Sequence, residues 1–323
     1  MKAIMRKSYG QTEKMLYLET PKPKLTEDKV LIKVHAAGIN QADIYLLQGK
    51  PFLIRLLLGL FKPKFKTLGS DVSGVVEEVG KDVEGFNVGD EVFGIFVFKQ
   101  EGGYSEYGLI GPKQITHKPK NVTHSEAASV SMAGVTALHA LRLAEVKEGT
   151  NVLIYGASGG VGTFMIQIAK YFKAHVTAVV STRNIDVAKA SGADIIIDYK
   201  KSKWDQDNKK YDVILACNGN NKLSRYRDAL NNDGKLVVSG GSSKNIFGIS
   251  IQKLFLRKKG NRTFQNFMAR IANKDLKLLA ELLEKKHIRP HIDKEFLLKD
   301  AKEAFEHFIN HKTIGKTIIK IVK

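Results

Sequence analysis

The stretch "TNVLIYGASGGVGTFMIQIAKYF", residues 150–172, decides the fold class of this chain. A continuous apolar run leads into a glycine-rich turn, and the turn leads into a segment with apolar residues at helical spacing. The turn reads A-x-G-x-x-G on Ala157, Gly159 and Gly162, close to the dinucleotide fingerprint G-x-G-x-x-G. This order predicts a βαβ unit whose helix N-terminus receives a pyrophosphate. A glycine-rich turn without a ligand is the alternative interpretation.

Strand and helix patterns alternate downstream of this turn. Apolar strand-like runs such as "AHVTAVVS", "ADIIIDY", "YDVILACNG" and "GKLVVSGG" are separated by helix-like segments such as "RNIDVAKASG" and "LSRYRDAL". Such alternation is typical of a parallel, doubly wound α/β sheet with helices on both faces. Upstream, residues 125–146 predict a helix, with Ser125 as its N-cap.

The first 115 or so residues are β-rich instead. "KVLIKVHAAG" (29–38) alternates between apolar and polar residues, and two Val-rich runs follow at 71–83 and 90–98. Their spacing favours an antiparallel, barrel-like domain. Within it lies the apolar stretch "PFLIRLLLGLF" (51–61), which is too short to span a bilayer. A core helix, a lid over a pocket and an interfacial membrane segment are all compatible with it, and we favour the core or lid helix.

Bulk properties restrict the class of protein. A length of 323 residues suggests two domains. The single cysteine, Cys217, excludes an intramolecular disulfide and a Cys-rich zinc module. No apolar run reaches the roughly 18 residues of a membrane span, so we predict a soluble, cytoplasmic protein without a membrane span. The net charge of +19 permits a nucleic-acid partner, but the lysines are spread along the chain and favour a solvated surface.

Two polar segments are candidates for chemistry. "HAAGINQADIYLLQG" (35–49) gathers polar groups directly after an apolar run, which leaves a metal site, a catalytic acid and a substrate site open. The second is "VVSTRN", where an NAD-selective protein would place Asp or Glu for the ribose 2′-hydroxyl. Ser181, Thr182 and Arg183 stand there instead, and they suit a 2′-phosphate, which predicts NADPH as the cofactor.

Taken together, the motifs resemble the medium-chain dehydrogenase/reductase superfamily, and within it the zinc-free quinone oxidoreductase branch. The resemblance is carried by "AAGIN-QAD", "GSDVSGVVEEVG", "VGDEVFG", "GGYSEY", "AGVTAL", "YGASGGVG", "STRN", "GADIIIDY" and "GKTIIKI", in the family's order. It implies a GroES-like β-rich catalytic domain at 1–124, completed by 266–323. It also implies a Rossmann NADPH-binding domain at 125–265, with the active site in the cleft between the two.

The resemblance also bears on metal and substrate. The superfamily's alcohol dehydrogenases bind catalytic zinc at positions that correspond to Gln41, Ser70 and Met132 here, and none of these is a zinc ligand of the expected kind. We therefore expect no metal. Hydride transfer from NADPH to a quinone is the implied reaction. The alternatives are a reductase of enones or alkenals and a basic NADPH-binding protein with an RNA-binding role.

Residue roles follow from the same resemblance. Tyr45 is the expected hydrogen-bond donor to the developing oxyanion, with a packed aromatic as the alternative. Asn40 is expected to position the acceptor, and Asp43 to hold the turn. A homodimer is expected. The predicted cofactor-binding residues are Thr136, Ala157, Ser158, Gly159, Gly160, Val161, Gly162, Ser181, Thr182, Arg183, Tyr199, Cys217, Asn218, Ser239, Gly240, Gly241 and Lys316.

Overall fold

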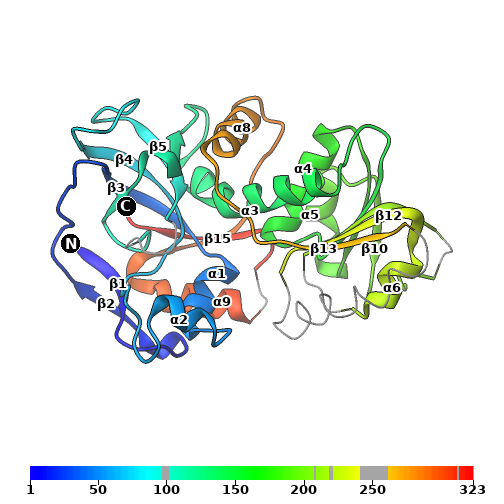
Figure 1. The fold of residues 1–323 in the computed structure, drawn as a ribbon, viewed down its shortest axis with the longest axis horizontal. Helices are drawn as coiled ribbons and strands as arrows, with labels where there is room; N and C mark the ends of the chain where they lie inside the picture. The colour runs from blue at the N-terminus through cyan, green and yellow to red at the C-terminus, as the bar shows by residue number, and fades with distance from the viewer. Residues whose placement is uncertain (97–101, 207–208, 218–220, 241–260, 311–312, 323) are drawn as a thin grey trace. The chain divides into compact units, whose positions relative to one another are not determined.

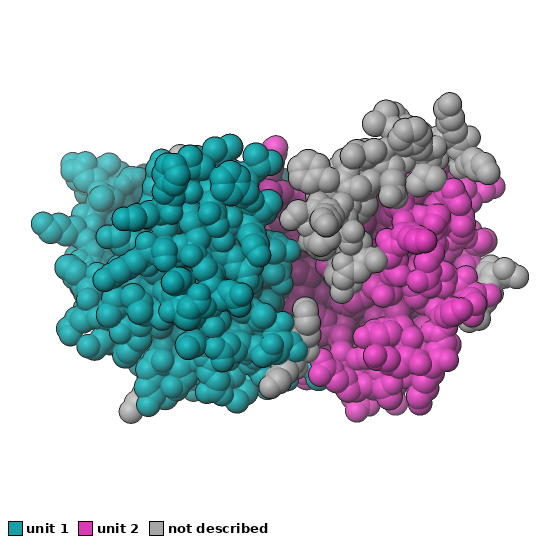
Figure 2. Space-filling view, turned by 90° about the horizontal axis from the view of Figure 1, so that it is seen from below, with its two compact units in different colours: residues 1–133, 271–286, 292–323 teal, residues 134–270, 287–291 magenta. Residues whose placement is uncertain are grey.

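A computed structural model describes residues 1–96, 102–206, 209–217, 221–240, 261–310 and 313–322. The chain divides into two compact units, which Figure 2 shows in teal and magenta. Unit 1 comprises residues 1–133, 271–286 and 292–323. Unit 2 comprises residues 134–270 and 287–291.

Unit 2 contains a parallel sheet with the strand order β10-β9-β8-β11-β12-β13 within the described residues (Figure 1). Counted from the first strand of this unit, the order is 3-2-1-4-5-6, that of the doubly wound dinucleotide-binding fold. The sequence prediction of this fold class is confirmed. The strands are β8 (Asn151–Tyr155), β9 (His175–Val180), β10 (Ile195–Asp198), β11 (Tyr211–Ala216), β12 (Leu230–Val238) and β13 (Thr263–Asn266). The helices are α4 (Gly160–Tyr171), η3 (Thr182–Asn184), α5 (Ile185–Ala190) and α6 (Leu223–Asp228).

The apolar runs read from the sequence become the buried centre of this sheet. Val152, Leu153 and Ile154 of β8 are fully buried, as expected for a central parallel strand with no polar face. The single tryptophan, Trp204, packs into the core of the same unit beside Tyr226. Unit 2 therefore has a hydrophobic core of its own.

Unit 1 is built on a mostly antiparallel sheet with the strand order β14-β15-β3-β4-β5-β7, in which β6 also pairs with β3. The C-terminal strand β15 pairs with β3, so the end of the chain completes the N-terminal sheet. Its strands are β3 (Val30–Gly38), β4 (Asp71–Val79), β5 (Glu91–Ile95), β6 (Tyr107–Ile110), β7 (Ile115–His117), β14 (Ile292–Leu297) and β15 (Lys316–Lys320). A separate pair is formed by β1 (Lys2–Arg6) and β2 (Met15–Glu19). The helices are η1 (Thr12–Lys14), α1 (Gln41–Gln48), α2 (Ile54–Leu58), η2 (Pro112–Gln114), α8 (Asn273–Glu284), η4 (Leu298–Asp300) and α9 (Ala301–Ile309).

Helix α3 (His124–Leu143) carries residues of both units, and its N-cap differs from the prediction. Ser125 lies inside the helix, so its assignment as the N-cap is wrong. Thr123 precedes the helix, and its hydroxyl accepts from Glu126 N while Glu126 Oε2 accepts from Thr123 N. This reciprocal capping box satisfies two backbone donors, which a cap at Ser125 would leave unpaired.

The apolar stretch 51–61 does not form a core helix. Only Ile54–Leu58 is helical, and four side chains flanking or within this turn are at least 60% exposed, namely Phe52, Leu53, Leu56 and Phe61. The core-helix interpretation is therefore wrong. Among the described residues, no helix combines the length and the apolar character that crossing a membrane requires.

Candidate functional site

The turn between β3 and α1 is held by a buried carboxylate. Asp43 is fully buried, and its Oδ2 accepts a hydrogen bond from Asn40 N at 2.9 Å. Its Oδ1 accepts from Ser70 N at 3.1 Å and from Ser70 Oγ at 2.7 Å. Burial raises the pKa of Asp43 to about 6, although the hydrogen bonds from Ser70 and Asn40 act in the opposite direction. Asp43 thus holds the turn, as the sequence predicts.

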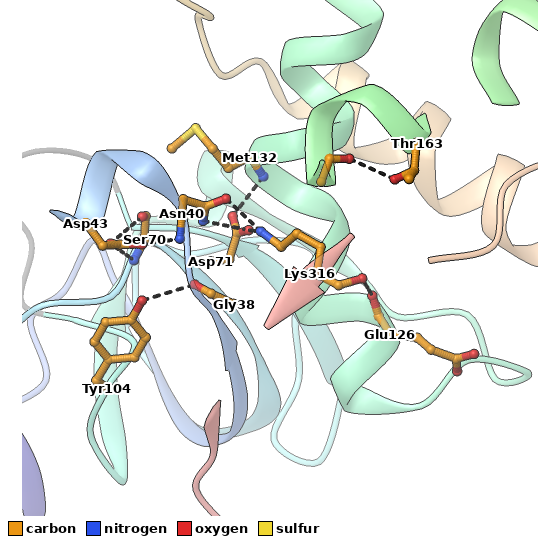
Figure 3. Close-up of polar contacts among 12 residues, drawn as sticks. Gly38, Asn40, Asp43, Ser70, Asp71, Tyr104, Glu126, Met132, Thr163 and Lys316 are labelled. Carbon is orange, nitrogen blue, oxygen red and sulfur yellow. Dashed lines mark hydrogen bonds and ion pairs between the residues drawn. The ribbon is translucent and has the colours of Figure 1, made fainter. Parts of the chain in front are cut away.

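A buried ion pair lies beside this turn (Figure 3). Lys316 Nζ, at the start of β15, lies 3.1 Å from Asp71 Oδ2, at the start of β4. Asn40 bridges the two, since its Nδ2 donates to Asp71 Oδ2 at 3.0 Å and its Oδ1 accepts from Lys316 Nζ at 2.6 Å. Asp71 Oδ1 accepts from Met132 N at 2.8 Å. One carboxylate therefore ties together the α1 turn, α3 and β15.

Two of the three positions that correspond to zinc ligands in the alcohol dehydrogenases, Ser70 and Met132, bond to these buried carboxylates. Gln41 is exposed at the first position of α1. The Ser70 hydroxyl donates to Asp43, and the Met132 backbone N–H donates to Asp71. In the part of the chain that the structure describes, no group of three or more His, Cys, Asp or Glu side chains is placed to hold a metal ion. The polar groups here are arranged to bond to one another.

The two residues predicted to face the substrate lie in the same segment. Tyr45, on α1, is half-buried, and burial raises the pKa of its phenol. Its hydroxyl therefore stays protonated at neutral pH and can donate a hydrogen bond. Asn40 is 8% exposed, and both ends of its side-chain amide are engaged with Asp71 and Lys316. This geometry suits a positioning role for Asn40, and a protonated phenol is compatible with a donor role for Tyr45.

The phosphate loop of unit 2 has the steric properties of a cofactor cradle. A Cβ on Gly162 would lie 2.4 Å from Gly156 O, so only glycine allows α4 to pack this closely against the loop. A Cβ on Gly159 would meet no atom nearer than Gly156 O at 3.8 Å, so this face of the loop is open. Free backbone N–H groups at the start of α4 suit a phosphate there. The residues present therefore fit a dinucleotide.

The end of β9 carries the residues predicted to select the cofactor. Arg183 and Thr182 are exposed and Ser181 is half-buried. The Thr182 hydroxyl donates to Asp198 Oδ2, at the end of β10, at 2.7 Å. Asn184 Nδ2 donates to Ser158 Oγ at 2.8 Å and so joins this turn to the phosphate loop.

The remaining predicted cofactor residues are distributed over unit 2 and β15. Cys217 ends β11, and burial raises the pKa of its thiol to about 12, as expected for an inert strand-end cysteine. Thr136 lies on α3, Ser239 and Gly240 follow β12, and Tyr199 is 47% exposed after β10. Asn218 and Gly241 lie outside the described residues.

Sequence analysis missed Asp71, Asp198 and the link between Asn184 and Ser158. Asp71 had a detectable signal, since it is the one charged residue in "GSDVSGVV", a run whose other members are small or apolar. Asp198 likewise follows three consecutive isoleucines. In both cases an acidic residue at one end of an apolar run, the start for Asp71 and the end for Asp198, marked a buried hydrogen-bond acceptor.

Comparison with known proteins agrees with this geometry. Residues 26–121 match the family described as alcohol dehydrogenase GroES-like domain, and residues 191–319 the family described as zinc-binding dehydrogenase. The chain is 32% identical over 334 residues to the chloroplastic quinone oxidoreductase QR1 of Triphysaria versicolor, covering 99% of this chain and 98% of that protein. The chain belongs to the quinone oxidoreductase branch of the medium-chain dehydrogenase/reductase superfamily.

Two further members of this superfamily support the assignment. The human mitochondrial NAD(P)H oxidoreductase RTN4IP1 is 32% identical to this chain, over 100% of the chain and 89% of the human protein. The structure of the quinone oxidoreductase from Coxiella burnetii superposes with a TM-score of 0.89 at 32% identity, covering 100% of this chain and 99% of that one. The predicted fold, a GroES-like domain with a Rossmann domain, is thereby confirmed.

Proposed function

We propose that this protein is an NADPH-dependent reductase that transfers a hydride to a quinone without the help of zinc. The observation that carries the proposal concerns the three positions of the alcohol dehydrogenase zinc ligands. Gln41 is exposed, the Ser70 hydroxyl donates to Asp43, and the Met132 backbone N–H donates to Asp71. Without a Lewis acid at this place, the acceptor must already be electron-poor. Quinones meet this requirement, and relatives of this chain bear the name quinone oxidoreductase.

The phosphate loop and the end of β9 would hold the cofactor. The start of α4 suits the pyrophosphate, and the exposed Arg183 guanidinium suits a 2′-phosphate. Positions 181 and 182 carry hydroxyl side chains rather than the carboxylate that would bind a ribose 2′-hydroxyl. The nearby Asp198 carboxylate already accepts a hydrogen bond from the Thr182 hydroxyl. When bound, NADPH supplies the hydride.

Tyr45 would complete the reaction on the acceptor side. Hydride addition leaves negative charge on a quinone oxygen, and a hydrogen-bond donor aimed at that oxygen stabilises it. The raised pKa of Tyr45 keeps its hydroxyl in the donating form. Asn40, fixed by Asp71 and Lys316, would hold the start of α1 in place.

The experiment is an NADPH-oxidation panel over benzoquinones, naphthoquinones, enones, alkenals and simple alcohols, repeated with NADH. We expect the highest kcat/KM with NADPH and a quinone. Arg183→Ala should lower the preference for NADPH over NADH about tenfold or more. Lys189→Ala, the same change of charge on the exposed face of α5, should not.

Tyr45→Phe tests the acceptor side, with Tyr17→Phe, an exposed tyrosine on β2, as its control. Removal of one oxyanion donor should lower kcat about 100-fold or more. Turnover of alcohols alone, or a tightly bound equivalent of zinc in the purified protein, would overturn the proposal. We also propose that the protein is a homodimer in solution, which its mass by light scattering tests.

A further inference from the structure

The segment from Gly49 to Leu68 combines apolar and cationic residues in an unusual way. Its sequence, "GKPFLIRLLLGLFKPKFKTL", contains five Lys or Arg residues and no Asp or Glu. The structure exposes much of the apolar part, although large apolar side chains ordinarily lie in a core. The feature therefore requires a partner that covers apolar surface and carries negative charge.

We define the apolar ridge as five exposed side chains of this segment. Their exposed fractions are 62% for Phe52, 60% for Leu53, 63% for Leu56, 39% for Leu60 and 86% for Phe61. All five fall within ten consecutive residues, whereas the other exposed large apolar side chains in the described ranges occur singly or in sequence-adjacent pairs. Large exposed apolar side chains that gather in one short segment are typical of an interaction site.

The ridge is held in a defined conformation rather than being a loose loop. Leu58 is 3% exposed, and Pro63 is buried as well. Tyr9 Oη donates to Gly59 O at 2.8 Å. Arg55 Nε donates to Gly49 O at 3.0 Å, and the Arg55 guanidinium lies over the Tyr9 ring. These contacts fix α2, whose place in the fold Figure 1 shows, while Phe52, Leu53 and Leu56 remain exposed.

Cationic side chains flank the ridge on both sides in the sequence. Lys50 precedes it, and Lys62, Lys64 and Lys66 follow it, all four exposed. A second copy of this chain is a poor occupant, since pairing the same surface twice would bring these lysines together without a carboxylate between them. An anionic lipid surface has the complementary charge and a boundary that accepts apolar side chains.

We propose that the apolar ridge and its four lysines dock the protein onto the surface of an anionic lipid bilayer. Phe61 and Leu56, the most exposed members, enter the boundary between head groups and acyl chains, and the lysines contact lipid phosphates. The proposal goes beyond the proposed reductase activity and does not depend on it, because docking requires neither cofactor nor acceptor.

Vesicle co-sedimentation of the full chain tests the proposal. The probes are vesicles of phosphatidylcholine alone and of phosphatidylcholine with about one-third phosphatidylglycerol, at about 0.05 M and about 0.5 M salt. We expect binding to the anionic vesicles that weakens at high salt. Leu56→Ser/Phe61→Ser should lower the partition coefficient at least about tenfold. Lys62→Glu/Lys64→Glu should lower it by a similar factor and flatten its salt dependence.

Matched controls separate docking by the ridge from nonspecific hydrophobic adsorption and from an effect of net charge. Val88→Ser and Met268→Ser remove other apolar side chains that are 69% and 82% exposed. Lys277→Glu/Lys285→Glu makes the same change in net charge on exposed positions of unit 1 away from the ridge. All variants should retain wild-type circular dichroism and thermal unfolding.

Three outcomes would overturn the proposal. The first is no binding of the wild-type protein to anionic vesicles at low salt, as a lid that covers only substrate would give. The second is an equal loss of binding in the ridge variants and the controls. The third is conversion of a dimer into a monomer by Leu56→Ser/Phe61→Ser, which would make the ridge an interface between copies.

Discussion

Lys316→Met is expected to remove much of the stability of unit 1, because it leaves the Asp71 carboxylate buried without its cation. Lys316 Nζ and Asp71 Oδ2 are 3.1 Å apart, and the two side chains are 3% and 0% exposed. At that separation the attraction is about 5 kcal/mol for an effective dielectric constant of about 20. Removing one partner of a buried pair costs about 3–5 kcal/mol, and we expect a loss of this size in the free energy of unfolding.

A double variant isolates the charge effect. In Asp71→Asn/Lys316→Met both charges are removed together, and the introduced amide oxygen can still accept the Met132 N–H that Asp71 accepts at 2.8 Å. Charge is then no longer buried without compensation. We expect the double variant to be at least about 1–2 kcal/mol more stable than Lys316→Met alone.

The assay is urea unfolding followed by far-UV circular dichroism and by tryptophan fluorescence. Trp204, the only tryptophan, reports on the core of unit 2, so a shift seen by circular dichroism alone locates the loss in unit 1. Lys2→Met is the control, because Lys2 and Glu19 are also 3.1 Å apart but are 44% and 74% exposed. A loss in Lys316→Met no larger than in Lys2→Met, or a double variant less stable than the single one, would refute this reasoning.

Three other predictions follow from the structure. Gly162→Ala places a Cβ 2.4 Å from a backbone oxygen and should lower thermal stability, by about 1–3 kcal/mol. In Gly159→Ala the nearest atom to the added Cβ is Gly156 O at 3.8 Å, so this variant should keep its thermal stability but bind NADPH more weakly, as measured by calorimetry. Equal losses of stability in the two variants would contradict the role of the loop as a cofactor cradle. Cys217 is half-buried and the pKa of its thiol is raised to about 12, so it should react with a thiol reagent at pH 8 much more slowly in the native protein than after unfolding; equal rates would contradict the raised pKa. Burial, and to a lesser extent the neighbouring His35, lowers the pKa of the His124 imidazole to about 4, below its value in the unfolded chain. As pH falls from about 6.5 towards 4, the unfolded chain therefore takes up the proton before the folded protein does. The free energy of unfolding, measured with urea, should drop by roughly 1–2 kcal/mol across this window. The drop should be smaller in His124→Gln.

The fold of unit 2 was predictable because its determinants are local in the sequence. Each strand is a short apolar run, and the phosphate loop joins β8 to α4 within a few residues. The need for glycine at position 162 was also predictable, since the fingerprint places a glycine where helix and strand approach closely. Periodicity and turn chemistry therefore agree with the tertiary structure in this unit.

The stretch 51–61 was mispredicted because apolarity alone does not say which surface covers a side chain. Leu58 is buried and Phe61 is 86% exposed, although both are large and apolar. Gly59, which has a φ of 113°, ends α2 between them, and its carbonyl accepts a hydrogen bond from Tyr9, a residue 50 positions earlier. No local pattern contains that contact.

The network around Asp71 shows the same limit at the candidate site. The identities of Gln41, Ser70 and Met132 can be read directly from the sequence. The residues that bond to one another at this place could not be read, since Lys316 is 245 positions from Asp71 and its ammonium reaches the carboxylate only when β15 pairs with β3.

This arrangement links the stability of unit 1 to the proposed chemistry. The Asp71 carboxylate holds Asn40, and Asn40 together with Asp43 fixes the first turn of α1, the helix that carries Tyr45. A buried cation on the C-terminal strand therefore helps to orient a hydroxyl near the N-terminal end of the chain. If that orientation serves catalysis, Lys316→Met should lower kcat more than KM even at temperatures where the variant remains fully folded, whereas Lys2→Met should change neither.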